Sequence, residues 1–244
     1  MRPQRGRPPG PGEAGRLPAR SQFARRLDAA AEEGYQDKHP FALLLNAGKL
    51  TKRQLRGWIV NWFYFEKSVP QKDAAIISNC PHPEARRLWM TRILEHDGYG
   101  SHEGAREGWI RLGEAAGLAR RALEEAEYLP GVVDAVDGYI LFARRSTWIE
   151  GVAASLTQRN LPRLIEARLA AFRDHYAWVR PEGLGYFHSL KTIAKNESRT
   201  ALNLVLRYAT TPEDERRAVE AVARMNGVLG AMLDAIYEAY CRSG

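Results

Sequence analysis

The stretch from Leu50 to Gly100 constrains the fold of this chain more than any other. Apolar residues recur in its first half at intervals of three and four, which predicts a helix with a broad buried face. Thr51 is a suitable N-cap for that helix. The apolar spacing resumes after Pro70, so we expect one long helix, kinked at the proline, around which the other elements are organised.

Charged residues interrupt the apolar pattern of this stretch. Glu66, Lys72 and Asp73 stand among the aromatic residues of the long helix, where a charge is unfavourable unless it is paired or functional. A second helix is predicted from Pro83 to about residue 95, and it runs into the sequence Glu-His-Asp-Gly around His96. A histidine between two carboxylates at a helix end indicates a proton-handling position. We therefore expect any chemistry to lie near His96.

The rest of the chain also has a helical pattern. The segments 132–158, 183–209 and 213–241 have apolar residues at helical spacing, and shorter helices are predicted between them. No run of four to eight residues alternates in the manner of a strand, and no repeat of fixed period is present. We predict an all-α fold, a single-domain bundle of seven to nine helices.

The positive charge of the chain is concentrated at its N-terminus. The formal net charge is +7, but residues 1–26 hold seven arginines and one acid. Residues 1–18 are also rich in proline and poor in apolar residues, so we expect a disordered tail before a domain that spans residues 19–244. Because the remaining residues 27–244 are nearly neutral, we expect no nucleic-acid partner.

The sequence also bears on the compartment of the protein. No stretch approaches the roughly 18 consecutive apolar residues of a membrane span, and residues 1–26 lack the apolar core of a secretory signal. We therefore expect no membrane partner. Cys80 and Cys241 have neither metal-binding nor redox spacing. They predict reduced thiols in a cytoplasmic protein.

Four segments of the chain resemble the PqqC family of pyrroloquinoline-quinone synthases. They are residues 57–81 (GWIVNWFYFEKSVPQKDAAIISNCP), 86–98 (RRLWMTRILEHDG), 129–145 (LPGVVDAVDGYILFARR) and 155–158 (SLTQ). Weaker similarity continues in the family's order, so the resemblance spans about residues 35–240. Several long segments in register are far more specific than a single motif.

The resemblance implies a haem-oxygenase-like helical fold and a homodimer. It also implies an oxidoreductase of coenzyme PQQ biosynthesis, which oxidises a polyanionic quinone precursor in a closed pocket. The resemblance further implies molecular oxygen as the co-substrate, without a metal or organic cofactor. Such a reaction needs side chains that neutralise carboxylates and move protons from carbon.

The resemblance also assigns site residues. The catalytic positions that it implies are His96, Lys72 and Tyr186. In this assignment His96 is the general acid/base, Lys72 holds an anionic group together with Arg168, and the tyrosines orient the substrate or peroxide. The substrate-binding positions are Tyr35, Trp62, Glu66, Tyr139, Gln158 and Arg168.

The chain departs from the family at other polar positions. Cationic or histidine positions of the family hold Gln36, Trp62, Ile165, Leu190 and Asn226, and further replacements are Phe65, Glu66 and Gln158. A pocket with fewer cations matches a tricarboxylate poorly, because unpaired buried charge is unfavourable. Trp62, Phe65 and Ile165 also make the pocket more apolar. We therefore expect an aromatic or quinonoid small-molecule ligand that is less charged than the family's usual one.

Simpler interpretations of the same residues remain open. His96 is also suited to capping its helix, and Lys72 to pairing with Glu66 or Asp73 on its own helix. Arg168 is suited to bridging acids along a helix surface. Tyr139 and Tyr186 are then core tyrosines with satisfied hydroxyl groups.

Two other functions remain open as well. One is a non-catalytic small-molecule-binding or interaction protein that retained the scaffold. The other is a di-metal oxygenase, since relatives of this fold hold two metal ions through Glu and His from several helices. The ligands available for a di-iron site are Glu66, His96, Glu150, Gln158 and His188, which fall short in number and type. We therefore expect no metal.

Overall fold

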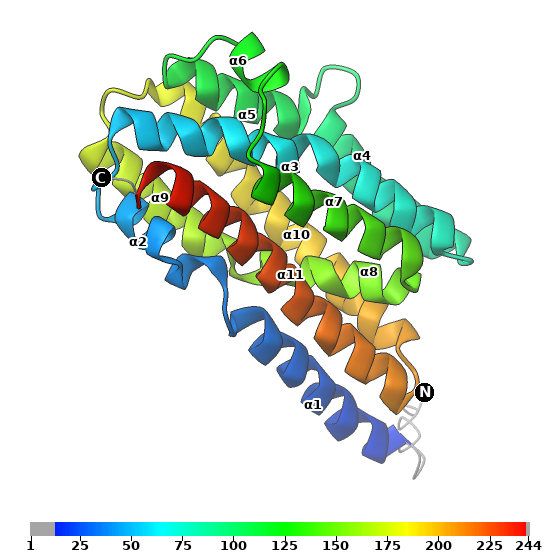
Figure 1. Cartoon of the computed structure of the whole chain (residues 1–244). Helices are drawn as coiled ribbons and strands as arrows, with labels where there is room; N and C mark the ends of the chain where they lie inside the picture. Colours follow the sequence, from blue (N-terminus) through cyan, green and yellow to red (C-terminus); the bar gives the residue numbers. More distant parts are fainter. Residues whose placement is uncertain (1–12, 243–244) are drawn as a thin grey trace, which may run out of the picture.

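The computed structural model describes residues 13–242, with side chains from residue 20 onward. Within this range the structure is all-α, without a β-strand, and its chain folds into one bundle (Figure 1). The α-helices are α1 (Glu13–Glu32), α2 (Pro40–Asn46), α3 (Lys52–Asn79), α4 (Pro83–Asp97), α5 (Gly104–Ala115), α6 (Arg121–Glu124), α7 (Pro130–Arg145), α8 (Trp148–Ala154), α9 (Leu161–His175), α10 (Gly185–Tyr208) and α11 (Pro212–Tyr240). Three 3₁₀ helices connect them: η1 (Gln36–Lys38), η2 (Ser155–Asn160) and η3 (Pro181–Leu184).

Helix α3 is the element around which the bundle is built, as the sequence predicts. It packs against α7, α4 and α5, while α11 packs against α7, α8 and α1 on another side (Figure 1). The Thr51 cap is confirmed as a capping box, because its hydroxyl accepts from the Gln54 amide and the Gln54 side chain accepts from the Thr51 amide. Pro70 lies inside α3, and the helix continues through it to Asn79.

The eleven α-helices of the described residues exceed the predicted seven to nine. The main reason is the segment 132–158, which we expected to be one helix. Helix α7 ends at Arg145, Ser146 is extended, and Thr147 begins α8 with a capping box to Glu150. The chain then tightens into η2. The apolar spacing continues across these breaks, so periodicity alone joins elements that the Ser-Thr pair separates.

The N-terminal boundary differs from the expected one. Helix α1 begins at Glu13, so residues 13–18 of the predicted tail belong to a helix, and residues 1–12 of that tail lie outside the described residues. Cys80 and Cys241 are free thiols. Within residues 13–242 no helix combines the length and the apolar character that a membrane span requires.

Candidate functional site

One cavity in the interior of the bundle gathers all nine side chains that the sequence assigned to the site. Its volume is about 70 Å³. Its wall comes from η1 and the preceding Tyr35, and from α3, α4, α7, α8, η2, α9, α10 and α11. These nine residues are Tyr35, Trp62, Glu66, Lys72, His96, Tyr139, Gln158, Arg168 and Tyr186. This volume is enough for about five water molecules at roughly 15 Å³ each, so the cavity is small.

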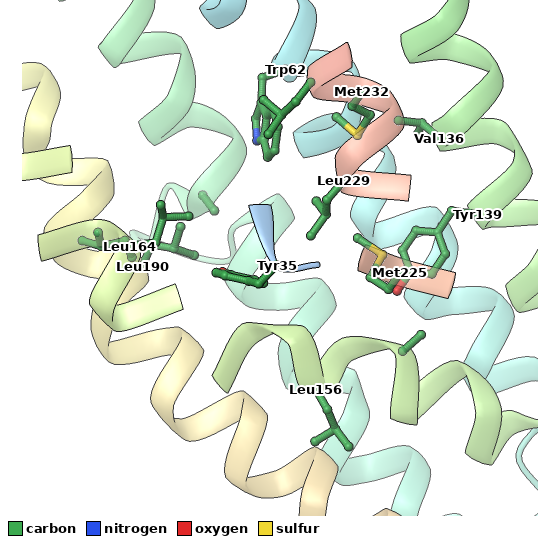
Figure 2. Packing of buried hydrophobic residues seen from close by; sticks show 14 of the residues in the cluster. Tyr35, Trp62, Val136, Tyr139, Leu156, Leu164, Leu190, Met225, Leu229 and Met232 are labelled. Atoms are coloured by element: carbon green, nitrogen blue, oxygen red, sulfur yellow. The ribbon is translucent and has the colours of Figure 1, made fainter. Parts of the chain in front are cut away.

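Apolar side chains form one part of the wall. Trp62, Leu190, Met225 and Leu229 approach the same region as Tyr35, from three different helices (Figure 2). Trp62 also packs against the ring of Phe65, with 5.7 Å between the ring centroids. The sequence predicted this apolar character from Trp62, Phe65 and Ile165. Trp62 and Phe65 line the cavity, Ile165 does not, and Leu190 adds to the apolar wall. A flat aromatic ligand suits such a wall.

A buried ionic network lies beside the cavity, and two of its members, Lys72 and Arg92, line it. Asp73 accepts hydrogen bonds from Lys72, from the indole N–H of Trp89 (2.9 Å) and from Arg92 Nε (3.2 Å). Arg92 also binds Glu197 on α10. The network therefore contains two cations and two carboxylates, and each charge has an opposite partner.

Other polar groups complete this network. Arg92 donates to the side-chain oxygen of Gln158 at 2.8 Å, and Lys72 Nζ lies 3.4 Å from Ser155 Oγ. Burial lowers the pKa of Lys72 to about 8, although Asp73 acts in the opposite direction. The expectation that Lys72 is free to hold an anionic group is not met in the structure, because Asp73 neutralises it. Its pairing with Asp73 was the simpler interpretation left open by the sequence.

A second cluster of polar side chains surrounds Glu66. Its Oε1 accepts from Trp62 Nε1 at 3.1 Å and from the hydroxyl of Tyr186 at 2.8 Å, and its Oε2 has no hydrogen-bond partner. Burial raises the pKa of Glu66 to about 7, against the hydrogen bonds from Tyr186 and Trp62 and the charge of Arg168. The proton of this carboxyl group is therefore exchangeable near neutral pH.

Arg168 differs from the other two cations of the cavity wall. It is buried, its guanidinium stacks over Trp58 (5.1 Å to the ring centroid), and its hydrogen-bond partner is the neutral side chain of Gln36 at 3.2 Å. Its Nε has no partner. The alternative that Arg168 bridges acids along a helix surface is therefore wrong. Among the described cations of the wall, Arg168 is the one suited to an anionic group of a ligand.

His96 lies at the end of α4 and is buried, with 3% of its surface exposed. Neither ring nitrogen has a hydrogen-bond partner, so His96 does not cap its helix. Burial and the neighbouring cation Arg92 lower its pKa to about 3, although Asp73 acts in the opposite direction. The imidazole is therefore neutral at pH 7, with one nitrogen that donates and one that accepts.

The expectation that His96 lies between the carboxylates of Glu95 and Asp97 is wrong for the folded structure. The adjacent Glu95 turns away and pairs with His102 at 3.2 Å, and Asp97 is exposed. Successive residues on a helix point about 100° apart, so neighbours in sequence are not neighbours at the site. The charged groups that influence its pKa are instead Arg92, Asp73 and Lys72.

Sequence reasoning missed Arg92 and the role of Glu197. Arg92 precedes His96 by four residues, which places both side chains on one face of α4. That spacing was a usable signal. Glu197 offered none, since its meeting with Arg92 across 105 residues depends on how α10 packs.

The positions at which the chain departs from the family divide into two groups. Gln36, Trp62, Phe65, Glu66, Gln158 and Leu190 line the cavity. Ile165 and Asn226 do not, and Asn226 instead donates hydrogen bonds to the carbonyls of Ala30, Ala31 and Glu33 at the end of α1. A residue that joins two helices thus occupies a position at which the family has a cation.

The proposed metal ligands are dispersed. Glu150 closes the capping box of α8, and His188 is exposed on α10, so neither joins Glu66 and His96. Within the described residues no three His, Cys, Asp or Glu side chains are grouped in a metal-binding arrangement.

The chain is similar in sequence to known proteins. Residues 25–239 match the TENA/THI-4/PQQC family. The chain is 45% identical to a pyrroloquinoline-quinone synthase of Cronobacter sakazakii over 207 residues, which are 84% of this chain and 82% of the relative. It is 39% identical over 222 residues to the enzyme of that name from Pseudomonas aeruginosa, covering 91% of this chain and 88% of the relative.

Solved structures agree at the level of fold. A Shewanella denitrificans domain with a heme oxygenase-like fold superposes with a TM-score of 0.73 at 14% identity, over 92% of each chain. A TenA homolog from Pseudomonas syringae also has a TM-score of 0.73, at 11% identity, over 89% of this chain and 92% of its own. The predicted haem-oxygenase-like, all-α fold is confirmed. The chain is a member of the TENA/THI-4/PQQC family.

Proposed function

We propose that the protein is an oxygen-dependent oxidoreductase of the pyrroloquinoline-quinone synthase type, acting on an aromatic quinone precursor in PQQ-type biosynthesis. Identity of 39–45% to proteins of that name over most of the chain supports the reaction class. Its cavity, however, has a smaller supply of free cations than a polyanionic substrate needs. We therefore propose a diverged member whose ligand has fewer carboxylates.

The observation that carries this proposal is His96. A neutral imidazole with two unpartnered nitrogens lines an aromatic cavity inside the bundle. One nitrogen accepts a proton from a ligand, and the other donates. Such a group left without partners in the interior is unfavourable unless a ligand or water satisfies it.

The proposed chemistry balances without a cofactor. A dihydroxy-aromatic ligand loses two electrons and two protons to become a quinone, and molecular oxygen takes up both electrons and both protons to become hydrogen peroxide. His96 accepts a proton from the ligand, and Arg168 holds a single carboxylate. Tyr35, Tyr139 and Tyr186 orient the ligand or peroxide, and Gln158 contributes a polar contact beside Arg92.

Two measurements test the proposal: oxygen uptake and ligand binding read from tryptophan fluorescence. Both use dihydroxybenzenes that carry one, two or three carboxylates. His96→Ala is expected to lower oxygen uptake by about 10²–10⁴-fold while binding is retained, because the variant loses a proton acceptor. His188→Ala, which changes an exposed histidine outside the cavity, is the matched control and should keep its rate.

Other outcomes select the two alternatives. Binding without oxygen uptake by the wild-type protein indicates a non-catalytic binding protein. Two irons per chain in elemental analysis, with uptake lost after chelation, indicate a di-metal oxygenase. Equal rates in wild type and His96→Ala contradict the role of His96.

The expected setting is a cytoplasmic homodimer with neither a nucleic-acid nor a membrane partner. Large apolar side chains exposed on α4, among them Met90 and Leu94, support self-association. The near-neutral charge of residues 27–244 supports the absence of a nucleic-acid partner.

A further inference from the structure

Glu66 occupies an unusual position on α3. It is a carboxyl group with 3% of its surface exposed, and it lines the cavity without a salt bridge to any described cation. Both of its hydrogen bonds, from Trp62 and from Tyr186, go to Oε1. Oε2 is buried and has no partner.

This arrangement fixes the carboxyl group in one orientation. Trp62 lies one turn before Glu66 on α3, and Tyr186 reaches it from α10, so two elements hold the same oxygen. Rotating the carboxyl group exchanges its two oxygens but adds no hydrogen bond, because both donors still face the same position. One oxygen therefore remains available, and a buried acceptor without a donor is unfavourable by itself.

The surroundings set the protonation of Glu66. Burial is the largest influence and favours the neutral acid, while the hydrogen bonds from Tyr186 and Trp62 and the charge of Arg168 favour the carboxylate. These opposing influences place the pKa at about 7. The other titratable or charged side chains that line the cavity are Tyr35, Lys72, Arg92, His96, Tyr139, Arg168 and Tyr186.

We propose that Glu66 is a second proton-transfer residue of this cavity, with Oε2 exchanging a proton with a hydroxyl group of the ligand while Oε1 stays bound to Trp62 and Tyr186. This inference rests on the proposed function for the identity of the reaction. Glu66 and His96 form a pair of titratable groups whose environments move their pKa values in opposite directions, an arrangement that separates two proton-handling roles in one site.

The proton balance of the reaction then has a place for both residues. The two protons that leave the dihydroxy-aromatic ligand pass to Glu66 and to His96. The two electrons pass to molecular oxygen. The reduced oxygen then takes both protons, leaves as hydrogen peroxide, and returns both side chains to their starting forms.

The first test uses the ligand-free protein. Because the Trp62 indole donates to Glu66, ionisation of Glu66 should change tryptophan fluorescence with a midpoint near pH 7. Glu66→Gln keeps the shape and the hydrogen-bond acceptor but cannot ionise, and Trp62→Phe removes the reporter, so both should lose this transition. Glu166→Gln, at an exposed acid on α9, is the matched control and should keep it.

The second test measures oxygen uptake with 3,4-dihydroxybenzoate across pH 5–9. The wild-type rate should show an inflection near pH 7, and Glu66→Gln should lose the inflection and fall by about 10²-fold at pH 8. An unchanged fluorescence transition or an unchanged pH–rate profile in Glu66→Gln overturns the inference. Absence of oxygen uptake by the wild-type protein instead defeats the proposed function, and the fluorescence titration still decides whether Glu66 is the ionising group.

Discussion

At the scale of single residues, Asp73 stabilises the buried ionic network beside the cavity. It is fully buried and accepts from Lys72, Trp89 and Arg92. Burial raises the pKa of a carboxyl group, but Arg92 and Lys72 outweigh it and hold the pKa of Asp73 below its usual range. Its charge is therefore part of the folded structure.

Replacing Asp73 by Asn should destabilise the protein at neutral pH. Asn keeps the shape but leaves two buried cations with one carboxylate, and removing a partner from a buried ion pair typically costs about 3–5 kcal/mol. Urea unfolding at pH 7 measures the difference. A loss below about 1 kcal/mol contradicts this account of the network.

The same residue gives a pH dependence with a definite sign. Because its pKa is lowered on folding, Asp73 contributes stability above the unfolded value of about 3.9, and this contribution disappears as pH falls through the folded value. Wild type should therefore lose more stability than Asp73→Asn between pH 5 and pH 2. Parallel losses in the two proteins contradict the prediction.

At the scale of elements, the contact of α8 with α3 determines where η2 lies. Gly151 on α8 faces Ile76 on α3, and a Cβ atom there meets the Ile76 side chain at 2.6 Å. Helix α8 leads without interruption into η2, which supplies Ser155 and Gln158 to the cavity. A displacement of α8 therefore displaces part of the site wall.

Gly151→Ala is expected to destabilise the protein by about 1–3 kcal/mol, because it overpacks this contact. Gly138→Ala is the matched control, since Gly138 is exposed in the middle of α7 and has no atom within 4 Å of an added Cβ. That change should stabilise by about 0.5–1 kcal/mol. The melting temperatures of both variants measure these effects. Equal shifts of the two melting temperatures in the same direction contradict the packing argument.

At the scale of the whole molecule, the proposed homodimer should depend on the exposed apolar side chains of α4. Met90 (43% exposed) and Leu94 (37%) lie one turn apart and therefore share a helix face. The double variant Met90→Lys/Leu94→Lys should be a monomer by light scattering, while Leu43→Lys, at an exposed leucine of α2, should remain a dimer. A monomeric wild type contradicts the proposed assembly, and a dimeric double variant contradicts this surface.

The sequence by itself determined the all-α class, the long central helix with its Thr51 cap, and nine of the side chains at the site, but not Arg92. Helical periodicity and capping are local, so the order of residues encodes them directly. The nine site residues followed from the family resemblance, and the structure places all of them around one cavity. The local signals failed at Ser146 and Thr147, where a capping box interrupts a continuous apolar pattern.

Only the tertiary structure decided which charges meet. Lys72 pairs with Asp73 and not with Glu66, whose partners are Trp62 and Tyr186. The Arg92–Glu197 pair and the burial of Arg168 likewise arise from helices far apart in the chain. Pairing and desolvation depend on distances between packed helices, and those distances set the protonation of Glu66 and His96. The sequence therefore identifies residues of the site, and the packing of the bundle determines their charge states.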